Sequence, residues 1–477
     1  MALAQFAAFL NTVSSKNKCS FSAPNHSNSH LMLSNKTLKF SAAILLILIG
    51  IFYCFQLVSP LRINTDAYRL LSMAVSASED KGYLVDGCTD QFPIGYPFLV
   101  RMLLMAGIGD SGSLAALNLL FYAVGLCVLW VWSRSLADRS LSLIVVLWVV
   151  SSWVLIKHAS IPLTEAGYFG LSLAALYCLK NFLNFPLKNA WKWFIASIFL
   201  IYLSLQFRTT GITLLPTAAV TAILHPGFHP FWINFGIYRS KIIATLALVF
   251  IVSCAILIFI IQNDWFVSQF LAKGSYFKSM LGYFDRLGAL GVFNQNLEFR
   301  VREMGEIVLN FPENKALILR PAYYLAGSAG WALIAAGSIW LWRRKFFPIV
   351  AYLIFYLVLM MMWPSYDARF WIPLLPIFSL AVWGWLSELT PNRKLIRFGC
   401  LAVMGCHILI GLVALSFSTR ISFSGKNMSE YFGEKSTQMT YREAFRNGLP
   451  VEAELVHPGK VRILQVFEPM AKQNLLK

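Results

Sequence analysis

Residues 41–59 read SAAILLILIGIFYCFQLVS, an uncharged and almost wholly apolar run that follows a polar segment of residues 1–39. A helix of roughly 20 apolar residues is long enough to cross the hydrocarbon core of a membrane. The run is full length, so we expect a signal anchor rather than a cleavable signal peptide. Comparable runs predict about eleven spans, at residues 41–59, 113–132, 140–156, 162–180, 192–206, 211–224, 242–262, 321–342, 346–363, 370–387 and 398–418.

The sixth run, residues 211–224, is short and contains Pro216. It is either a kinked span or a re-entrant segment, because neighbouring helices can satisfy the backbone groups that a proline frees.

The composition places the whole chain in one class. Of the 477 residues, 58% are hydrophobic and only 13% are charged, and the mean hydropathy is +0.63. Soluble domains of this size are less apolar, so the sequence predicts an all-α polytopic membrane protein. The net charge of +18 does not indicate a nucleic-acid partner, because Lys and Arg stand in tails and short loops rather than in one basic domain.

The basic residues predict the orientation of the spans. Lys and Arg accumulate in short cytoplasmic loops of membrane proteins. Here they occupy the N-terminal tail and alternate loops, at Lys16, Lys18, Lys36, Lys39, Arg134, Arg139, Lys180, Lys188, Lys192, Arg239, Lys241, Arg343, Arg344, Lys345, Arg393, Lys394 and Arg397. The opposite, extracytoplasmic face then receives a large first loop at residues 60–112 and a second long loop at 262–320.

Three regions follow from this topology. Residues 1–39 are rich in Ser and Asn and are expected to be a disordered cytoplasmic tail. Residues 40–418 form the membrane domain, with both long loops on its outer face. Residues 419–477 are expected to be an extracytoplasmic tail, either a small folded cap or a loose segment, and an even number of spans would instead put them in the cytoplasm.

Four charged residues stand at outer ends of spans, namely Asp66, Glu165, Arg208 and Arg369. Asp66 is either a general base or a residue that caps the next helix or lies in water. Glu165 follows Pro162 at a predicted helix start, where an acid also suits the helix dipole. Either arginine is a fork for phosphate oxygens or a side chain that reaches the lipid headgroups.

Other outer residues carry weaker signals. The segment from Tyr96 to Ile108 is amphipathic and too short to cross, so we expect it at the membrane interface, where it could receive a lipid-linked substrate. His158 lies near the outer face, and packing there is the main alternative to a role in a site. Among eight cysteines, only Cys88 clearly falls in an outer loop and no paired spacing occurs, so neither a disulfide framework nor a metal site is indicated.

The order of four motifs resembles a known superfamily. They are Asp66 with Tyr68 two positions later, the Pro-Ile-Gly-Tyr-Pro stretch at residues 93–97, the pair Thr164-Glu165, and Asp367-Ala-Arg369 before a Pro-rich span with Pro373 and Pro376. Over residues 40–417 the chain resembles glycosyltransferases of the GT-C superfamily. Its layout is similar to that of protein O-mannosyltransferases and lipid A aminoarabinose transferases.

The resemblance implies a GT-C-like helical bundle and a transfer reaction. A sugar would move from a polyprenyl-phosphate or dolichyl-phosphate carrier to a glycolipid, glycan or protein acceptor on the non-cytoplasmic face, with inversion. By resemblance Asp66 is the catalytic base, Glu165 orients a substrate, and Arg208 and Arg369 hold the leaving phosphate. We include as further substrate contacts Tyr68, Tyr96, His158 and Asp367. A bacterial inner membrane is favoured over the endoplasmic reticulum.

The chain departs from the superfamily pattern at one position. Many relatives have an Asp-Glu pair where this chain has Asp66-Ala67, so a second acid there is not supported, and Asp86 or Asp90 is the alternative. Some lipid-linked glycosyltransferases use a divalent ion, but no residue pattern here specifies one, and no cofactor is expected.

Two other classes remain as alternatives. A ligase or polymerase of lipid-linked glycans would use the same face and the same arginines, but would depend less on Asp66. A lipid or solute transporter would place ionisable residues near the bilayer midplane and show internal repeats. Here the spans are almost free of charge, with His407 as the main exception, and no repeat is visible.

Overall fold

The computed structural model describes residues 36–136, 139–226, 276–363, 365–389 and 394–468. Regular structure in these ranges is helical except for β1 (Leu84–Val85) and β2 (Cys88–Thr89), which pair antiparallel. The expected all-α class is therefore confirmed. The expected span at 242–262 and the tail before residue 36 lie outside the described residues.

The expected spans within the described ranges correspond to helices. They are α2 (Lys36–Cys54) with η1 (Phe55–Val58), α5 (Ser111–Leu136), α6 (Arg139–Val150) with α7 (Trp153–His158), α8 (Thr164–Asn184), α9 (Leu187–Phe207), η2 (Thr209–Thr213) with α10 (Leu214–Ile223), α15 (Arg320–Arg343), α16 (Phe347–Met362), η6 (Ala368–Leu374) with α17 (Leu375–Leu389), and α18 (Lys394–Ser422). Six described segments are long and apolar enough to cross a membrane, and the described part of the chain also has four shorter apolar helices. The chain is therefore an integral, multi-pass membrane protein.

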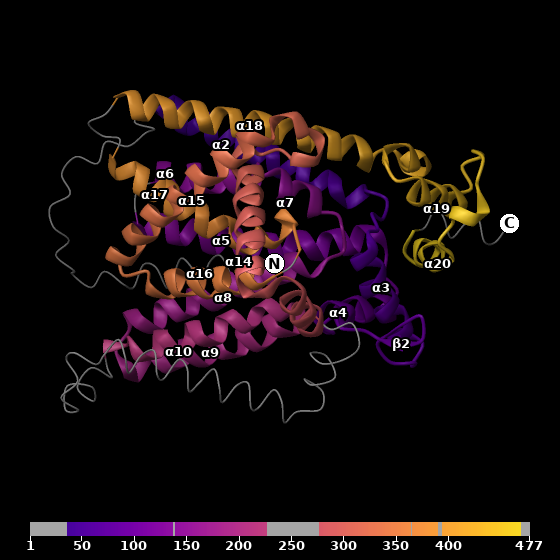
Figure 1. Ribbon diagram of the computed structural model, residues 1–477, viewed down its shortest axis with the longest axis horizontal. Coiled ribbons are helices and arrows are strands. Elements are labelled where there is room, and N and C mark those ends of the chain that lie inside the picture. The colour runs from indigo at the N-terminus through magenta and orange to yellow at the C-terminus, as the bar shows by residue number, and fades with distance from the viewer. Residues whose placement is uncertain (1–35, 137–138, 227–275, 364, 390–393, 469–477) are drawn as a thin grey trace.

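The remaining helices belong to the long loops and the C-terminal tail. They are α3 (Thr65–Ser78), α4 (Gly95–Met105), α14 (Tyr276–Leu309), η4 (Glu313–Lys315), η5 (Leu317–Leu319), η7 (Gly425–Tyr431), α19 (Lys435–Phe445), η8 (Ala453–Leu455) and α20 (Pro458–Phe467). In Figure 1, α3, α4, β2, α19 and α20 gather at the right-hand end of the bundle.

Contacts between loops identify the two ends of the bundle. At one end the Lys180 ammonium donates a hydrogen bond to the Lys345 carbonyl oxygen at 2.8 Å, and Arg344 pairs with Glu388. At the other end Arg462 pairs with Glu79 at 2.6 Å. Loops expected on the same side of the membrane therefore meet at the same end.

The third expected span is broken at Ser151 and Ser152, between α6 and α7. Backbone groups freed inside an apolar bundle need partners. Asn310 supplies them: its Oδ1 accepts a hydrogen bond from the Trp153 amide at 2.7 Å, and its Nδ2 donates to the carbonyl oxygens of Ser151 at 2.9 Å and His407 at 2.8 Å. The side chain of one fully buried asparagine therefore supplies hydrogen-bond partners to the backbone groups at the break between α6 and α7.

The described part of the second long loop is mainly a helix rather than irregular chain. Helix α14 is kinked at Gly288, whose φ is 67°, and packs along α15. The two backbones approach closely because glycines face each other's helix: a Cβ on Gly327 would lie only 1.8 Å from the Val301 carbonyl oxygen. This close approach packs the second half of α14 against the bundle.

We predict that Asn310→Gly lowers the free energy of unfolding by roughly 2 kcal/mol, because a buried amide and two carbonyl groups lose their partner. Glycine tolerates the φ of 56° at this position, so the backbone itself is not strained. Denaturant titration of the purified protein in detergent measures the change. Asn184→Gly, at the exposed end of α8, is the control; an equal loss in both variants would contradict the bridging role.

Candidate active site

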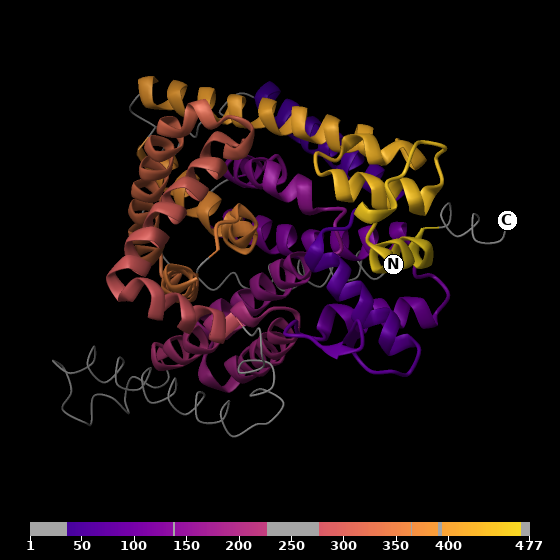
Figure 2. The ribbon, with the colours of Figure 1, turned by 45° about the vertical axis from the view of Figure 1, so that its right-hand side comes forward.

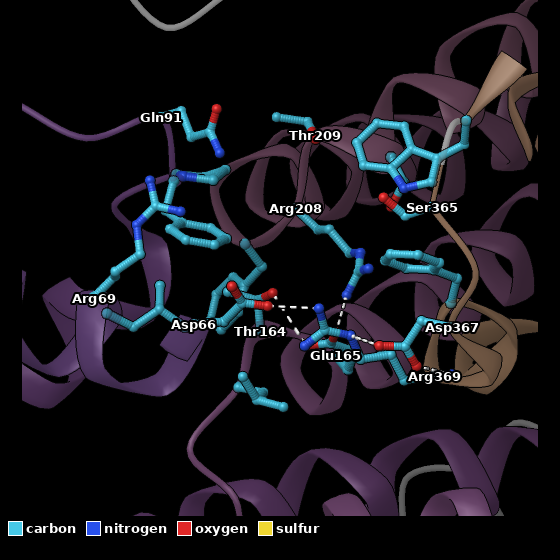
Figure 3. A pocket seen from close by; sticks show the side chains of 18 of the residues that line it. Asp66, Arg69, Gln91, Thr164, Glu165, Arg208, Thr209, Ser365, Asp367 and Arg369 are labelled. Atoms are coloured by element: carbon cyan, nitrogen blue, oxygen red, sulfur yellow. Dashed lines mark hydrogen bonds and ion pairs between the residues drawn. The ribbon is translucent and has the colours of Figure 1, made fainter. Parts of the chain in front are cut away.

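A cavity of about 280 Å³ lies at the α3–α4 end of the bundle. Figure 3 shows the charged side chains that point into it from four separate parts of the chain. The cavity is lined by Asp66, Arg69, Leu70, Gln91, Phe92, Pro93, Leu163, Thr164, Glu165, Phe207, Arg208, Thr209, Thr210, Trp363, Ser365, Tyr366, Asp367, Arg369 and Phe370. Of the eight residues that the sequence singled out, five therefore lie together.

The start of α3 directs Asp66 into the cavity. Asn64 is the N-cap of this helix, and its Oδ1 accepts a hydrogen bond from the Ala67 amide at 2.7 Å. The capping role considered for Asp66 is therefore filled by Asn64. The Asp66 carboxylate instead pairs with Arg369 Nη2 at 2.6 Å, and its side chain is 24% exposed.

Arg369 is surrounded by three carboxylates. Besides Asp66, its Nε lies 2.7 Å from an Asp367 oxygen and 3.6 Å from a Glu165 oxygen. The other Asp367 oxygen caps the start of η6 by accepting the Arg369 amide at 2.9 Å. Backbone and side chain of Arg369 are thus held by the same aspartate.

Glu165 connects the two arginines. Its carboxylate is 4% exposed and accepts Arg208 Nη1 at 2.6 Å. Arg208 also lies over the Phe370 ring, with its guanidinium carbon 5.2 Å from the ring centre. Opposite charges that are this close and this little exposed to solvent stabilise each other, while either one alone would be costly to bury.

One wall of the cavity was not predicted from the sequence. Arg69 follows Asp66 by three positions and therefore shares its helix face. It makes two hydrogen bonds to Asp90, at 2.7 and 2.9 Å, and lies over the Phe92 ring. The three-residue spacing from Asp66 was the sequence signal for Arg69 as a cavity residue. That spacing does not predict Asp90 as the partner of Arg69.

Three of the residues proposed as substrate contacts do not line the cavity. The Tyr68 hydroxyl donates to Asp86 at 2.7 Å, and burial is the main reason that the Tyr68 pKa rises to about 12. Tyr96 is fully buried and donates to Asn118 at 3.2 Å. His158 Nδ1 lies 2.7 Å from the Val154 carbonyl oxygen. These side chains pack around the cavity instead.

The cavity contains no evident metal site. Across the ranges that the structure describes, no group of three or more His, Cys, Asp or Glu side chains is arranged to hold a metal ion. The carboxylates in the cavity face guanidinium groups instead.

The C-terminal segment from η7 to α20 packs beside α3, as Figures 1 and 2 both show. The Tyr441 hydroxyl donates to the Leu61 carbonyl oxygen and accepts the Ile63 amide, each at 2.8 Å. Glu468 Oε1 accepts the Leu61 amide at 2.5 Å. The chain just before Asp66 is thus fixed by residues 378 to 407 positions later.

No protein-family profile matches the chain, and no curated protein matches it in sequence. Among solved structures, the chain is similar to ArnT from Cupriavidus metallidurans bound to undecaprenyl phosphate, with 11% identity and a TM-score of 0.48, over 91% of this chain and 75% of that one. A similarity at this level assigns neither a family nor an activity.

We predict that Glu165→Gln destabilises the protein by roughly 3 kcal/mol, because it leaves Arg208 buried without its closest charge partner. Unfolding midpoints in detergent measure the loss. Glu79→Gln is the matched control, since Glu79 pairs with Lys81 and Arg462 in a more exposed position. A smaller loss for Glu165→Gln than for the control would contradict the pairing argument.

We also predict that attachment of the C-terminal segment weakens as the pH rises. Burial raises the Glu468 pKa from 4.5 to about 7. A carboxyl with a higher pKa in the folded chain favours folding while it is protonated, so stability falls between those two values and then levels off. Glu468→Gln should remove this pH dependence, as measured by protease cleavage near residue 468, whereas exposed Glu454→Gln should keep it.

Proposed function

We propose that the protein is an integral membrane glycosyltransferase that moves a sugar from a polyprenyl-phosphate or dolichyl-phosphate carrier to an acceptor on the non-cytoplasmic face. The supporting observation is the 2.6 Å contact between Asp66 and Arg369, in a cavity that also holds Arg208 and Glu165. A carboxylate beside guanidinium groups suits a reaction in which a hydroxyl is activated and a phosphate departs.

The two arginines suit the phosphate. Guanidinium groups bind phosphate oxygens through paired, charge-assisted hydrogen bonds. In the cavity Arg369 and Arg208 approach each other through shared contact with Glu165, from η6 and from the end of α9. A phosphate between them would be bound from two directions, and the developing charge on the leaving group would be stabilised.

Asp66 is suited to act as the general base. As the acceptor oxygen attacks the anomeric carbon, its proton passes to Asp66, the bond from that carbon to the phosphate oxygen breaks, and polyprenyl phosphate leaves. Attack on the face opposite the phosphate inverts the anomeric centre. Asp66 pairs with Arg369, so a phosphate that binds Arg369 would replace this pairing and release the carboxylate for the acceptor.

An apolar surface beside the cavity suits a lipid carrier. Phe92 and Pro93 line the cavity, and α4 begins at Gly95 directly after them. On α4 the side chains of Phe98, Met102 and Met105 are exposed and recur at helical spacing. Such a face lies favourably at the boundary between headgroups and acyl chains.

The distribution of basic residues supports one side of the membrane for the cavity. Lys180, Arg344 and Lys345 gather at the end of the bundle away from the cavity, and basic loops favour the cytoplasm. We therefore propose that the cavity lies on the periplasmic or lumenal side.

The test is release of lipid phosphate from a panel of radiolabelled polyprenyl-phosphate sugars by the protein in lipid nanodiscs. We predict that Asp66→Asn lowers the transfer rate at least about 100-fold, because the hydroxyl loses its base. Asp80→Asn is the control, since Asp80 is in the same loop and 91% exposed. Full activity of Asp66→Asn would contradict the catalytic role. No release from any donor by folded wild-type protein would favour a glycan ligase or a transporter.

A further inference from the structure

We infer that the buried face of α14 positions residues 365–371, the segment that carries Arg369, for phosphate binding. Glu303 is the central positioning residue. The inference rests on the proposed function and deepens it. It assigns a role to a part of the second long loop that does not itself line the cavity.

Glu303 binds this segment through two hydrogen bonds. It is fully buried. Its Oε1 accepts the Asp367 amide and its Oε2 accepts the Trp371 indole N–H, each at 2.7 Å. These two donors bracket Arg369 in the sequence, so one carboxylate holds the backbone before the arginine and the Trp371 side chain after it.

Arg300, one helical turn earlier on α14, binds both Glu303 and the same segment. It pairs with Glu303 at 3.1 Å, and both side chains are almost completely buried. Its Nη2 donates to the Ser365 carbonyl oxygen at 2.7 Å. The charge that Glu303 brings into the bundle is therefore balanced by a side chain that binds the same segment.

A third contact involves Tyr366. Its hydroxyl lies 2.7 Å from Glu306 and 2.9 Å from Glu313. The hydroxyl donates toward both carboxyl groups, and Glu313 also pairs with Arg302 and Arg320. Tyr366 therefore connects the segment to Glu306 on α14 and to Glu313 in η4.

These contacts lead to the cavity through Asp367. Glu303 holds the Asp367 amide, the Asp367 carboxylate holds both the amide and the guanidinium of Arg369, and Arg369 holds Asp66. The orientation of the Arg369 fork therefore depends on α14. Misplacement of such a fork weakens phosphate binding even when every cavity residue is present.

The experiment is a double-mutant cycle between Glu303→Gln and Arg369→Ala, read by binding of undecaprenyl phosphate to the full chain in nanodiscs. Glutamine cannot accept both donors and leaves Arg300 without a counter-charge. We predict about tenfold weaker binding for Glu303→Gln, and no further loss when it is added to Arg369→Ala. Glu298→Gln, at a half-exposed position on the same helix, is the matched control and should bind like wild type.

The kinetics separate positioning from mere loss of fold. For the donor that wild type uses, KM should rise about tenfold in Glu303→Gln, while kcat at saturating donor changes by less than about threefold. A protein that is only partly folded would instead lose kcat at unchanged KM. Unchanged KM with lowered kcat, or losses that simply add in the cycle, would overturn the inference.

A second variant covers the case in which Glu303→Gln does not fold. Trp371→Phe removes one donor to Glu303 and keeps an aromatic ring, and it should weaken binding in the same direction. Wild-type binding by folded Trp371→Phe would then overturn the inference. Undiminished binding by Arg369→Ala would overturn the phosphate role itself, and the inference with it, whereas an effect of Arg369→Ala alone would leave the proposed function intact.

Discussion

The arrangement of the cavity depends on one guanidinium group shared by three carboxylates. Arg369 contacts Asp66, Asp367 and Glu165, and these acids come from α3, from the segment before η6 and from the start of α8. Because charges are costly to bury without partners, none of these elements can move away without leaving an uncompensated group. The site therefore holds together elements that are about 100 to 300 residues apart in the chain.

The same requirement shapes the rest of the bundle. Where α6 breaks from α7, the side chain of Asn310 satisfies the freed backbone groups. Where the chain enters α3, Tyr441 and Glu468 bind the backbone at Leu61. Polar side chains from the long loop and the tail thus bind backbone groups where helices break or begin.

Much of the fold could be predicted from the sequence, because an apolar run of membrane length has few alternatives to a helix. The break at Ser151 was not predictable, since neither proline nor glycine marks it and its partner Asn310 is distant. The helical character of α14 was also missed, because its polar residues resemble a loop. They are paired with Ser365, Tyr366, Asp367 and Trp371, which no local pattern reveals.

The sequence by itself determined the class of protein, the order of most spans and the common end at which Asp66, Glu165, Arg208 and Arg369 should lie, because span length and loop charge are local properties. Only the tertiary structure decided that Asn64 caps α3, that Asp66 faces Arg369, and that Tyr68, Tyr96 and His158 turn to other partners. The reason is physical. Which partner a charged or polar side chain finds depends on helices that pack from distant parts of the chain, and spacing along one helix does not specify them.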